Sequence, residues 1–170
     1  MPPGSSMSED DASLRQTGLP GLRARLFHSW FLLSRPMTLG ARGVVIDRAA
    51  NAVFLIEHTY VPGWHLPGGG VESGETVEEA LVRELREEGN FELTGPPVLK
   101  SLHHNRQSSR RDHVAVYLIE QYRQTGPKLP DHEIRNAGFF ALDALPDNLA
   151  GGTRRRIAEM FSGAEVSPYW

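Results

Sequence analysis

The protein has 170 residues, of which 39% are hydrophobic and 23% charged, values that fit one soluble globular domain with its own core. Its formal net charge of −3 excludes a protein that is basic over its whole surface, as a general nucleic-acid binder would be. Because the sequence contains no cysteine, disulfide bonds, thiolate metal ligands and a cysteine nucleophile are excluded as well.

The first stretch, MPPGSSMSEDDAS, is polar and acidic, whereas a secretory signal peptide starts with a basic region followed by an apolar one. We therefore expect a cytoplasmic protein whose residues 1–18 form a disordered tail. Residues 19–36 are expected to form a helix that packs on the domain, because apolar side chains recur there at helical spacing. These side chains are Leu22, Leu26, Trp30 and Leu33. The apolar run FHSWFLL is too short to span a bilayer, so no membrane partner is expected, and an interfacial membrane or dimer role for this helix is the less favoured alternative.

Residues 38–58 contain two apolar runs, TLGARGVVID and AVFLIEH, which are separated by RAAN and predict a β-hairpin. The following VPGWHLPGGG is too rich in turn residues to be helical. A helix is expected from Thr76 to Gly89, because Thr76 and Glu79 have the spacing of a capping box. Asn90 suits the end of this helix, since asparagine tolerates the left-handed backbone conformation.

Beyond this helix, strands are expected at FEL, at PVLKSLHH and, after the polar loop NRQSSRRD, in the alternating run HVAVYLIEQY. In that run, Val114, Val116 and Leu118 fall on one side of the strand, with Glu120 as a further candidate. The segment QTGPKLPDHE is expected to be a loop, GFFAL a short strand and GGTRRRIAEMF a closing helix. Mixed strands and helices without a long linker predict one α/β (α+β) sandwich domain over residues 37–165, followed by a short tail, 166–170.

The helix expected after Thr76 carries acidic side chains beside its apolar stripe. The stripe consists of Val77, Leu81 and Leu85. With successive residues about 100° apart, Glu84, Glu87 and Glu88 overlap this stripe. A solvated helix face with ion pairs to nearby arginines is the alternative, and it suits Glu78 and Glu79 better.

Carboxylates that cluster at the edge of a core repel one another and are costly to desolvate, so a cation is expected to join them. Because only oxygen ligands are present, we expect Mg²⁺, with Mn²⁺ as the alternative. The glycines at positions 68–70, just before the helix, would let the backbone approach a ligand closely, although an ordinary turn also uses glycine.

The spacing of these residues resembles the Nudix box: Gly, five residues, Glu, seven residues, Arg-Glu, an aliphatic residue, any residue, Glu-Glu, any residue, Gly and an aliphatic residue. The matching positions are Gly69, Glu75, Arg83, Glu84, Leu85, Glu87, Glu88 and Phe91. The preceding WHLPGG is similar to the family's usual lead-in. Asn90 stands where the family has glycine, and we expect little functional effect because asparagine can hold the same cap. Phe91 in place of an aliphatic residue is a mild change.

The resemblance to the MutT-like Nudix hydrolase family, with no subfamily assigned, implies an α/β/α sandwich with a mixed β-sheet. It also implies hydrolysis of a nucleoside diphosphate that is linked to some other group. Glu84, Glu87 and Glu88 would hold Mg²⁺, with Glu84 as the candidate that activates water. A small-molecule nucleotide is therefore the expected partner.

Further roles follow from the same resemblance. Arg83 would orient the glutamates, a surface ion pair being the alternative, and Glu75 would support the metal site. The carbonyl of Gly68 would be a further ligand. Glu133 resembles a glutamate that many members bring to the metal or use as the base, and a plain loop acid is an equal alternative.

Substrate-binding candidates lie in two other regions of the sequence. Arg106, Arg110 and Arg111 in HHNRQSSRRDH could bind phosphates, although a solvated loop is preferred for at least one of them. Tyr60 and Trp64 could stack on a base or ribose, although simple packing is favoured for Trp64.

The expected substrate is a nucleoside triphosphate or an ADP-ribose-like sugar nucleotide. One alternative is a catalytically weak regulator that binds nucleotides, which the complete set of box glutamates disfavours. The other is an RNA 5′-end pyrophosphohydrolase, which the net charge of −3 disfavours. Nudix enzymes are often dimers, and the helix around Trp30 offers an interface for a homodimer.

Overall fold

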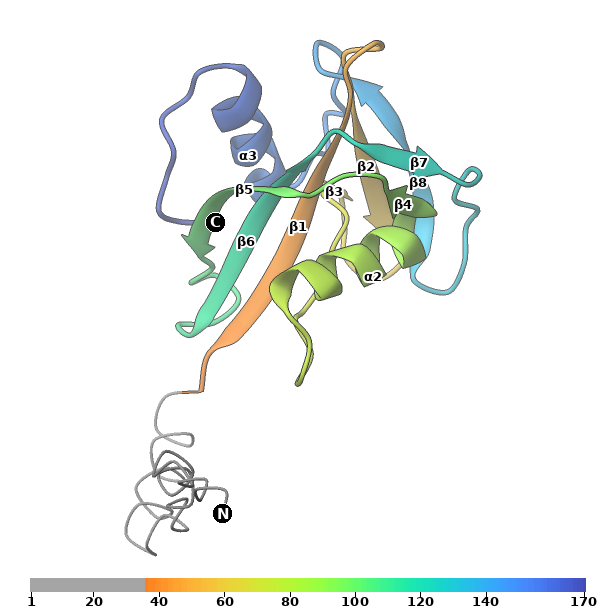
Figure 1. Ribbon diagram of the computed structural model, residues 1–170. Helices are drawn as coiled ribbons and strands as arrows, with labels where there is room; N and C mark the ends of the chain where they lie inside the picture. Colours follow the sequence, from red (N-terminus) through yellow and green to blue (C-terminus); the bar gives the residue numbers. More distant parts are fainter. Residues whose placement is uncertain (1–35) are drawn as a thin grey trace, which may run out of the picture. The chain divides into compact units, whose positions relative to one another are not determined.

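The computed structural model describes residues 36–170 (Figure 1). The tail expected over residues 1–18 and the helix expected over 19–36 lie outside the described residues, apart from Pro36. The described elements are, in chain order, β1 (Thr38–Asp47), β2 (Ala52–His58), β3 (Trp64–His65), α2 (Val77–Gly89), β4 (Phe91–Leu93), β5 (Val98–His104), β6 (Asp112–Ile119), β7 (Tyr122–Gln124), β8 (Ile134–Ala141) and α3 (Gly151–Phe161). Neither α2 nor α3 has the length and apolar character that a membrane-spanning helix needs.

A six-stranded mixed sheet forms the centre of the described residues. Its strand order is β3-β2-β1-β6-β5, and β8 also pairs with β2. β1 and β2 form the predicted antiparallel hairpin, whereas β1 and β6 run parallel from Thr38 and Asp112 to Val45 and Ile119. The short strands β4 and β7 pair separately. The mixed sheet confirms the α/β fold that the sequence predicts.

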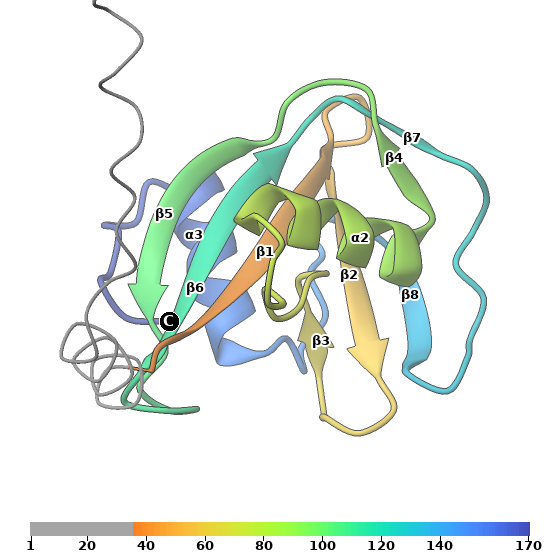
Figure 2. The same ribbon diagram turned by 60° about the horizontal axis from the view of Figure 1, so that its bottom comes forward.

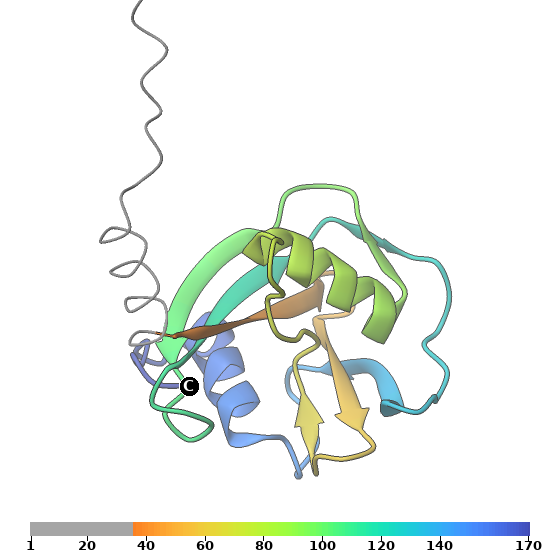
Figure 3. The same cartoon turned by 90° about the horizontal axis from the view of Figure 1, so that it is seen from below.

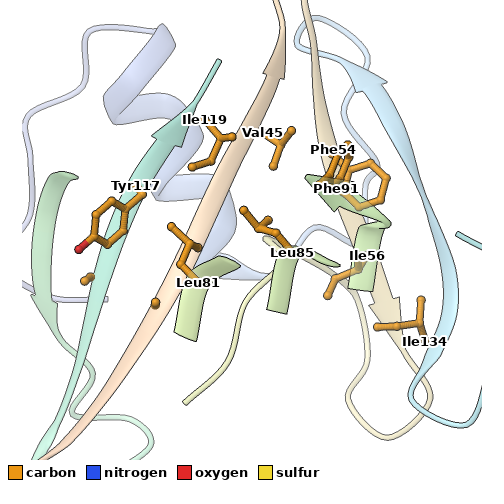
Figure 4. Packing of buried hydrophobic residues seen from close by; sticks show 11 residues of the cluster. Val45, Phe54, Ile56, Leu81, Leu85, Phe91, Tyr117, Ile119 and Ile134 are labelled. Atoms are coloured by element: carbon orange, nitrogen blue, oxygen red, sulfur yellow. The ribbon is translucent and has the colours of Figure 1, made fainter. Parts of the chain in front are cut away.

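One helix covers each face of this sheet, as the views in Figures 2 and 3 show. Ala41 and Val45 of β1 pack with Leu81 and Leu85 of α2 in one buried cluster, part of which is drawn in Figure 4. Alternate side chains of a strand point to opposite faces, so Val44 and Ile46 of β1 pack in a second cluster with Ile157 of α3. Because both faces are buried, the sheet is a rigid support for the loops at its ends.

The run HVAVYLIEQY forms β6, but the strand ends at Ile119, earlier than the alternation suggests. Val114, Val116 and Leu118 do share one side, where they belong to the cluster under α3. Glu120 lies beyond the strand, is exposed and pairs with Arg48.

Both ends of α2 match the sequence signals. The Thr76 hydroxyl accepts a hydrogen bond from the Glu79 N–H at 3.2 Å, and the Glu79 carboxylate accepts one from the Thr76 N–H at 2.7 Å. Asn90 takes the left-handed conformation, with φ 56° and ψ 35°. Its side-chain amide also donates to the Pro127 carbonyl at 3.1 Å. Asn90 therefore ends the helix and ties it to the loop before β8.

Replacing Asn90 with alanine is expected to lower the free energy of unfolding by about 1–2 kcal/mol, because alanine is disfavoured in the left-handed conformation. Asn90→Gly keeps a favourable cap and loses only the side-chain hydrogen bonds to the Gly126 and Pro127 carbonyls, so its loss of stability should be smaller. Urea denaturation of both variants beside the wild type tests this order. An alanine variant as stable as the glycine variant would contradict it.

Candidate active site

The glycine loop between β3 and α2 is fixed to the sheet by backbone hydrogen bonds. The Ala41 N–H donates to the Gly69 carbonyl at 2.9 Å, and the Gly43 N–H donates to the Pro67 carbonyl at 2.9 Å. Gly68 has φ 133°, and a Cβ there would overlap the Ala41 carbonyl oxygen. A Cβ on Gly69 would instead overlap the Glu84 carboxylate. The backbone of the loop therefore needs glycine at position 68, whereas glycine at position 69 leaves room for the Glu84 carboxylate.

Glu88 is the most deeply buried of the three glutamates proposed as metal ligands. Only 5% of the residue is exposed, and its Oε2 accepts a hydrogen bond from the Gly68 N–H at 2.6 Å. Burial raises the pKa of Glu88 to about 7, and the negative charges of Glu84 and Glu133 act in the same direction. The Gly68 N–H and the Arg42 charge oppose this rise without cancelling it. The positive charge around the buried Glu88 carboxyl group is thus too small to keep its pKa at the usual value.

The other two glutamates are less buried, because they lie farther around α2 from its packed face. Glu84 is half-buried and accepts a hydrogen bond from Arg83 Nη1 at 2.7 Å. The Glu87 side chain is 59% exposed, and its Oε2 lies 3.5 Å from the same Arg83 nitrogen. The angular positions along the helix predicted similar surroundings for the three glutamates. In the structure, Glu88 is buried, Glu84 is half-buried and Glu87 is exposed.

Arg83 links the helix to the glycine loop. Its Nη2 donates to Glu75 Oε1 at 2.9 Å and to the Gly70 carbonyl at 3.2 Å. The hydrogen bonds from Arg83 are the main cause that lowers the pKa of Glu75. Because the same guanidinium also holds Glu84, Arg83 fixes the position of two candidate site carboxylates relative to the loop.

Two residues that the sequence analysis did not select lie at this site. Arg42 Nη1 donates to the Leu66 carbonyl at 3.2 Å and to the Gly68 carbonyl, the oxygen that the sequence suggests as a metal ligand. The buried His58 has its Nε2 3.9 Å from Glu88 Oε1, and burial lowers the pKa of its ring. The signal for Arg42 in the sequence is a single charge inside the apolar strand TLGARGVVID.

Glu133 and Tyr60 lie at the exposed rim of the same site. The Thr59 N–H donates to the Glu133 carbonyl at 2.8 Å, which ties the loop before β8 to the end of β2. The Tyr60 ring stacks on His58 with centroids 5.0 Å apart, and the residue is 68% exposed. Burial, together with the charges of Glu88, Glu133 and Glu84, raises the pKa of Tyr60. Tyr60 lies against His58, which is 3.9 Å from Glu88, and the Thr59–Glu133 hydrogen bond brings Glu133 to the same end of β2.

The remaining substrate-binding candidates lie elsewhere. Trp64 packs edge-on against Phe140, with ring centroids 4.6 Å apart, as expected for a packing role. Arg106 stacks over the Tyr169 ring at 3.9 Å, whereas Arg110 and Arg111 are exposed.

A cavity of about 210 Å³ adjoins the glycine loop. Its polar and aromatic lining includes Arg42, His65, Asn105, Asp112 and Trp170, but none of the three arginines of the loop after β5. Trp170 reaches it because the segment 166–170 runs beside the end of β5, where the His104 N–H donates to the Pro168 carbonyl at 2.9 Å. The cavity opens next to Gly69 and therefore close to the carboxylates.

The donors at this site fit a hard divalent cation. They are carboxylate and carbonyl oxygens, and the raised pKa of the buried Glu88 indicates a need for positive charge that a cation would meet. Within residues 36–170, no three acidic or histidine side chains are already grouped as a metal site. Arg83 and Arg42 instead bind the Glu84 carboxylate and the Gly68 carbonyl.

Comparison with known proteins now identifies the family. The family model described as "NUDIX domain" matches residues 37–160, so the chain belongs to the Nudix hydrolase family, with MutT-like relatives. In fold, the crystal structure of the MutT NUDIX hydrolase from Burkholderia pseudomallei is similar, with a TM-score of 0.61 and 28% identity over 71% of this chain and 95% of that chain. The family and the enzyme class that the sequence predicts, a Nudix hydrolase, are thereby confirmed.

Curated relatives differ in the substrates that their names state. The 8-oxo-dGTP diphosphatase of Proteus vulgaris is 38% identical over 87 residues, which cover 49% of this chain and 76% of the relative. The ADP-ribose pyrophosphatase of Methanocaldococcus jannaschii is 41% identical over 104 residues, covering 56% and 58%. The NAD-capped RNA hydrolase NudC of Pseudomonas aeruginosa is 31% identical over 105 residues, covering 61% of this chain but only 36% of the relative. The chain thus spans between about a third and three quarters of these relatives.

Proposed function

We propose that this domain hydrolyses a pyrophosphate bond in a small nucleoside diphosphate derivative, either a nucleoside triphosphate or an ADP-ribose-like sugar nucleotide. The observation that carries the proposal is the buried Glu88 carboxyl group, which lies with Glu84 against a glycine loop whose Gly69 lines a cavity. The names of the Proteus and Methanocaldococcus relatives support both substrate types.

In the proposed mechanism, Glu84, Glu87 and Glu88 would hold Mg²⁺ or Mn²⁺, with the Gly68 carbonyl and Glu75 in support. A bound divalent cation would offset the charge of the pyrophosphate and lower the pKa of water. Arg83 keeps Glu84 facing the glycine loop through its hydrogen bond of 2.7 Å.

The hydrolytic step needs a base that can reach the attacking water. The water oxygen forms a bond to one phosphorus as the bond from that phosphorus to the bridging oxygen breaks, and the proton passes to a carboxylate. Glu84 is the proposed base. Glu133, at the rim beside Tyr60, is the alternative, and the losses in Glu84→Gln and Glu133→Gln would distinguish them.

The test is phosphate release, measured with a coupling phosphatase or pyrophosphatase, from a panel of substrates. The panel contains nucleoside triphosphates, ADP-ribose, sugar nucleotides, dinucleoside polyphosphates and capped RNA, each with Mg²⁺, with Mn²⁺ and with chelator. We expect cleavage of one small-nucleotide class, lost with chelator. Cleavage of capped RNA alone would favour the RNA-end hydrolase, and silence on every substrate despite nucleotide binding would favour the regulator.

A further inference from the structure

Arg42 combines an anchored nitrogen with unused hydrogen-bond donors. Its Nη1 donates to the carbonyls of Leu66 and Gly68, which accounts for both hydrogens on that nitrogen. Among residues 36–170, no carboxylate lies within ion-pair distance of Arg42, and its Nε and Nη2 donate to no protein atom. A guanidinium has five N–H donors, so three of them are available to a ligand.

Arg42 also lies between the cavity and the carboxylates. Of the described residues that line the cavity, Arg42 is the only arginine or lysine. The one carboxylate in the lining, Asp112, already accepts hydrogen bonds from Thr38 at 2.7 Å and from Asn105 at 2.8 Å. On the other side, Arg42 donates to the Gly68 carbonyl, and the N–H of the same glycine donates to Glu88 Oε2 at 2.6 Å. Arg42 thus connects the cavity wall to the buried carboxylate through Gly68.

Resting on the proposed function, we propose that Arg42 binds the substrate phosphate on the cavity side of the bond that is cleaved. The two carbonyls hold the guanidinium in place, and the free Nε and Nη2 edge offers the paired donors that match two phosphate oxygens. If Arg42 binds one phosphate of the pyrophosphate, the adjacent phosphate would lie beside Glu84 and Glu88. Arg42, and not the arginines of the loop after β5, then sets the position of the pyrophosphate.

The experiment measures binding of inorganic pyrophosphate by calorimetry in the presence of chelator. Steady-state kinetics are measured as well, on the substrate that the panel of nucleotides identifies. The variants are Arg42→Met, which removes the charge, and Arg42→Lys, which keeps the charge but not the paired donors. Arg123→Met is the matched control, because Arg123 pairs with Glu92 at the surface and does not line the cavity. Melting temperatures of all four proteins show whether each variant is folded.

We expect Arg42→Met to weaken pyrophosphate binding and to lower kcat/KM by about 10- to 100-fold, mainly through KM, as for loss of a charge-assisted hydrogen bond. Arg42→Lys should lie between it and the wild type, and Arg123→Met should be unchanged. A purely structural brace would lower the melting temperature of both Arg42 variants and leave pyrophosphate affinity unchanged, which would overturn the proposal. So would a wild type that binds no pyrophosphate in chelator. A wild-type kcat/KM in Arg42→Met would overturn this assignment alone, whereas a wild type without any hydrolysis would overturn the proposed function.

Discussion

Glu88→Gln is expected to lower kcat/KM by about 100-fold or more while the protein stays folded. Mutation of residues that only support metal ligands typically lowers metal affinity or activity by about 10- to 100-fold. A larger loss is expected here, because Glu88 is proposed as a ligand itself. The amide oxygen of glutamine can still accept the hydrogen bond from the Gly68 N–H, so the buried contact survives. Kinetics with saturating Mg²⁺ and a melting curve of the same sample would measure both parts.

The same variant should change how the stability of the metal-free protein depends on pH. Burial raises the pKa of Glu88 from 4.5 to about 7. The pKa of Glu88 in the folded protein is above its pKa in the unfolded chain. Its stabilising contribution to the free energy of unfolding is therefore fully present below about pH 4.5 and is lost as the pH rises through about 7. The difference corresponds to about 3 kcal/mol. Urea denaturation in chelator at pH 5 and at pH 8 should show this loss in the wild type but not in Glu88→Gln.

Glu87→Gln is the companion variant for this experiment. The Glu87 side chain is 59% exposed, so its replacement should leave the pH dependence of stability unchanged. If Glu87 binds the metal as proposed, activity should still fall. Normal turnover in both the Glu87 and the Glu88 variants would remove the metal-site assignment.

Alanine substitutions along the glycine loop are expected to have three different outcomes. Gly68→Ala should lower the free energy of unfolding by about 1–3 kcal/mol, because φ at this position is 133° and the new Cβ would meet the Ala41 backbone. Gly69→Ala should instead reduce activity with little loss of stability, since its Cβ would push aside the Glu84 side chain, which can move. Gly70→Ala should be nearly neutral, because nothing lies within 4 Å of its Cβ.

This series separates backbone strain from displacement of a site carboxylate, with Gly70 as the internal control. Each variant would be compared with the wild type by urea denaturation and by kcat/KM on the same preparation. A fully active Gly69→Ala protein would show that the position of Glu84 does not matter for the reaction. A Gly70 variant as impaired as the other two would show that the loop needs flexibility as such.

Local sequence signals predicted the elements that the structure shows most clearly. The capping box at Thr76, the left-handed Asn90 and the hairpin around RAAN depend on neighbouring residues, so they can be recognised in a short window. The same holds for the spacing of the glutamates on α2. Their unequal burial could not be predicted, because it depends on how α2 lies across β1 and the glycine loop.

The residues missed by sequence reasoning are those that distant segments bring together. Arg42 becomes a site residue only because the glycine loop folds back onto β1. Trp170 lines the cavity only because its segment pairs with the end of β5. That the arginines after β5 bind phosphates stays a prediction, and none of the three lines the cavity, whereas Asn105 and Ser108 of the same loop do.

The parallel pairing of β1 with β6 also bears on how the chain reaches its folded state. Thr38 and Asp112, which are hydrogen-bonded at 2.7 Å, are 74 positions apart in the chain. Contacts between such distant segments form late, because a long loop must close before any of them is gained. The β1–β2 hairpin and α2 can form early from local contacts. Until β6 pairs with β1, the backbone hydrogen-bonding groups on that edge of β1 stay unpaired. During synthesis or refolding, this unpaired edge of β1 could pair with a strand of another chain, so we expect aggregation to start there.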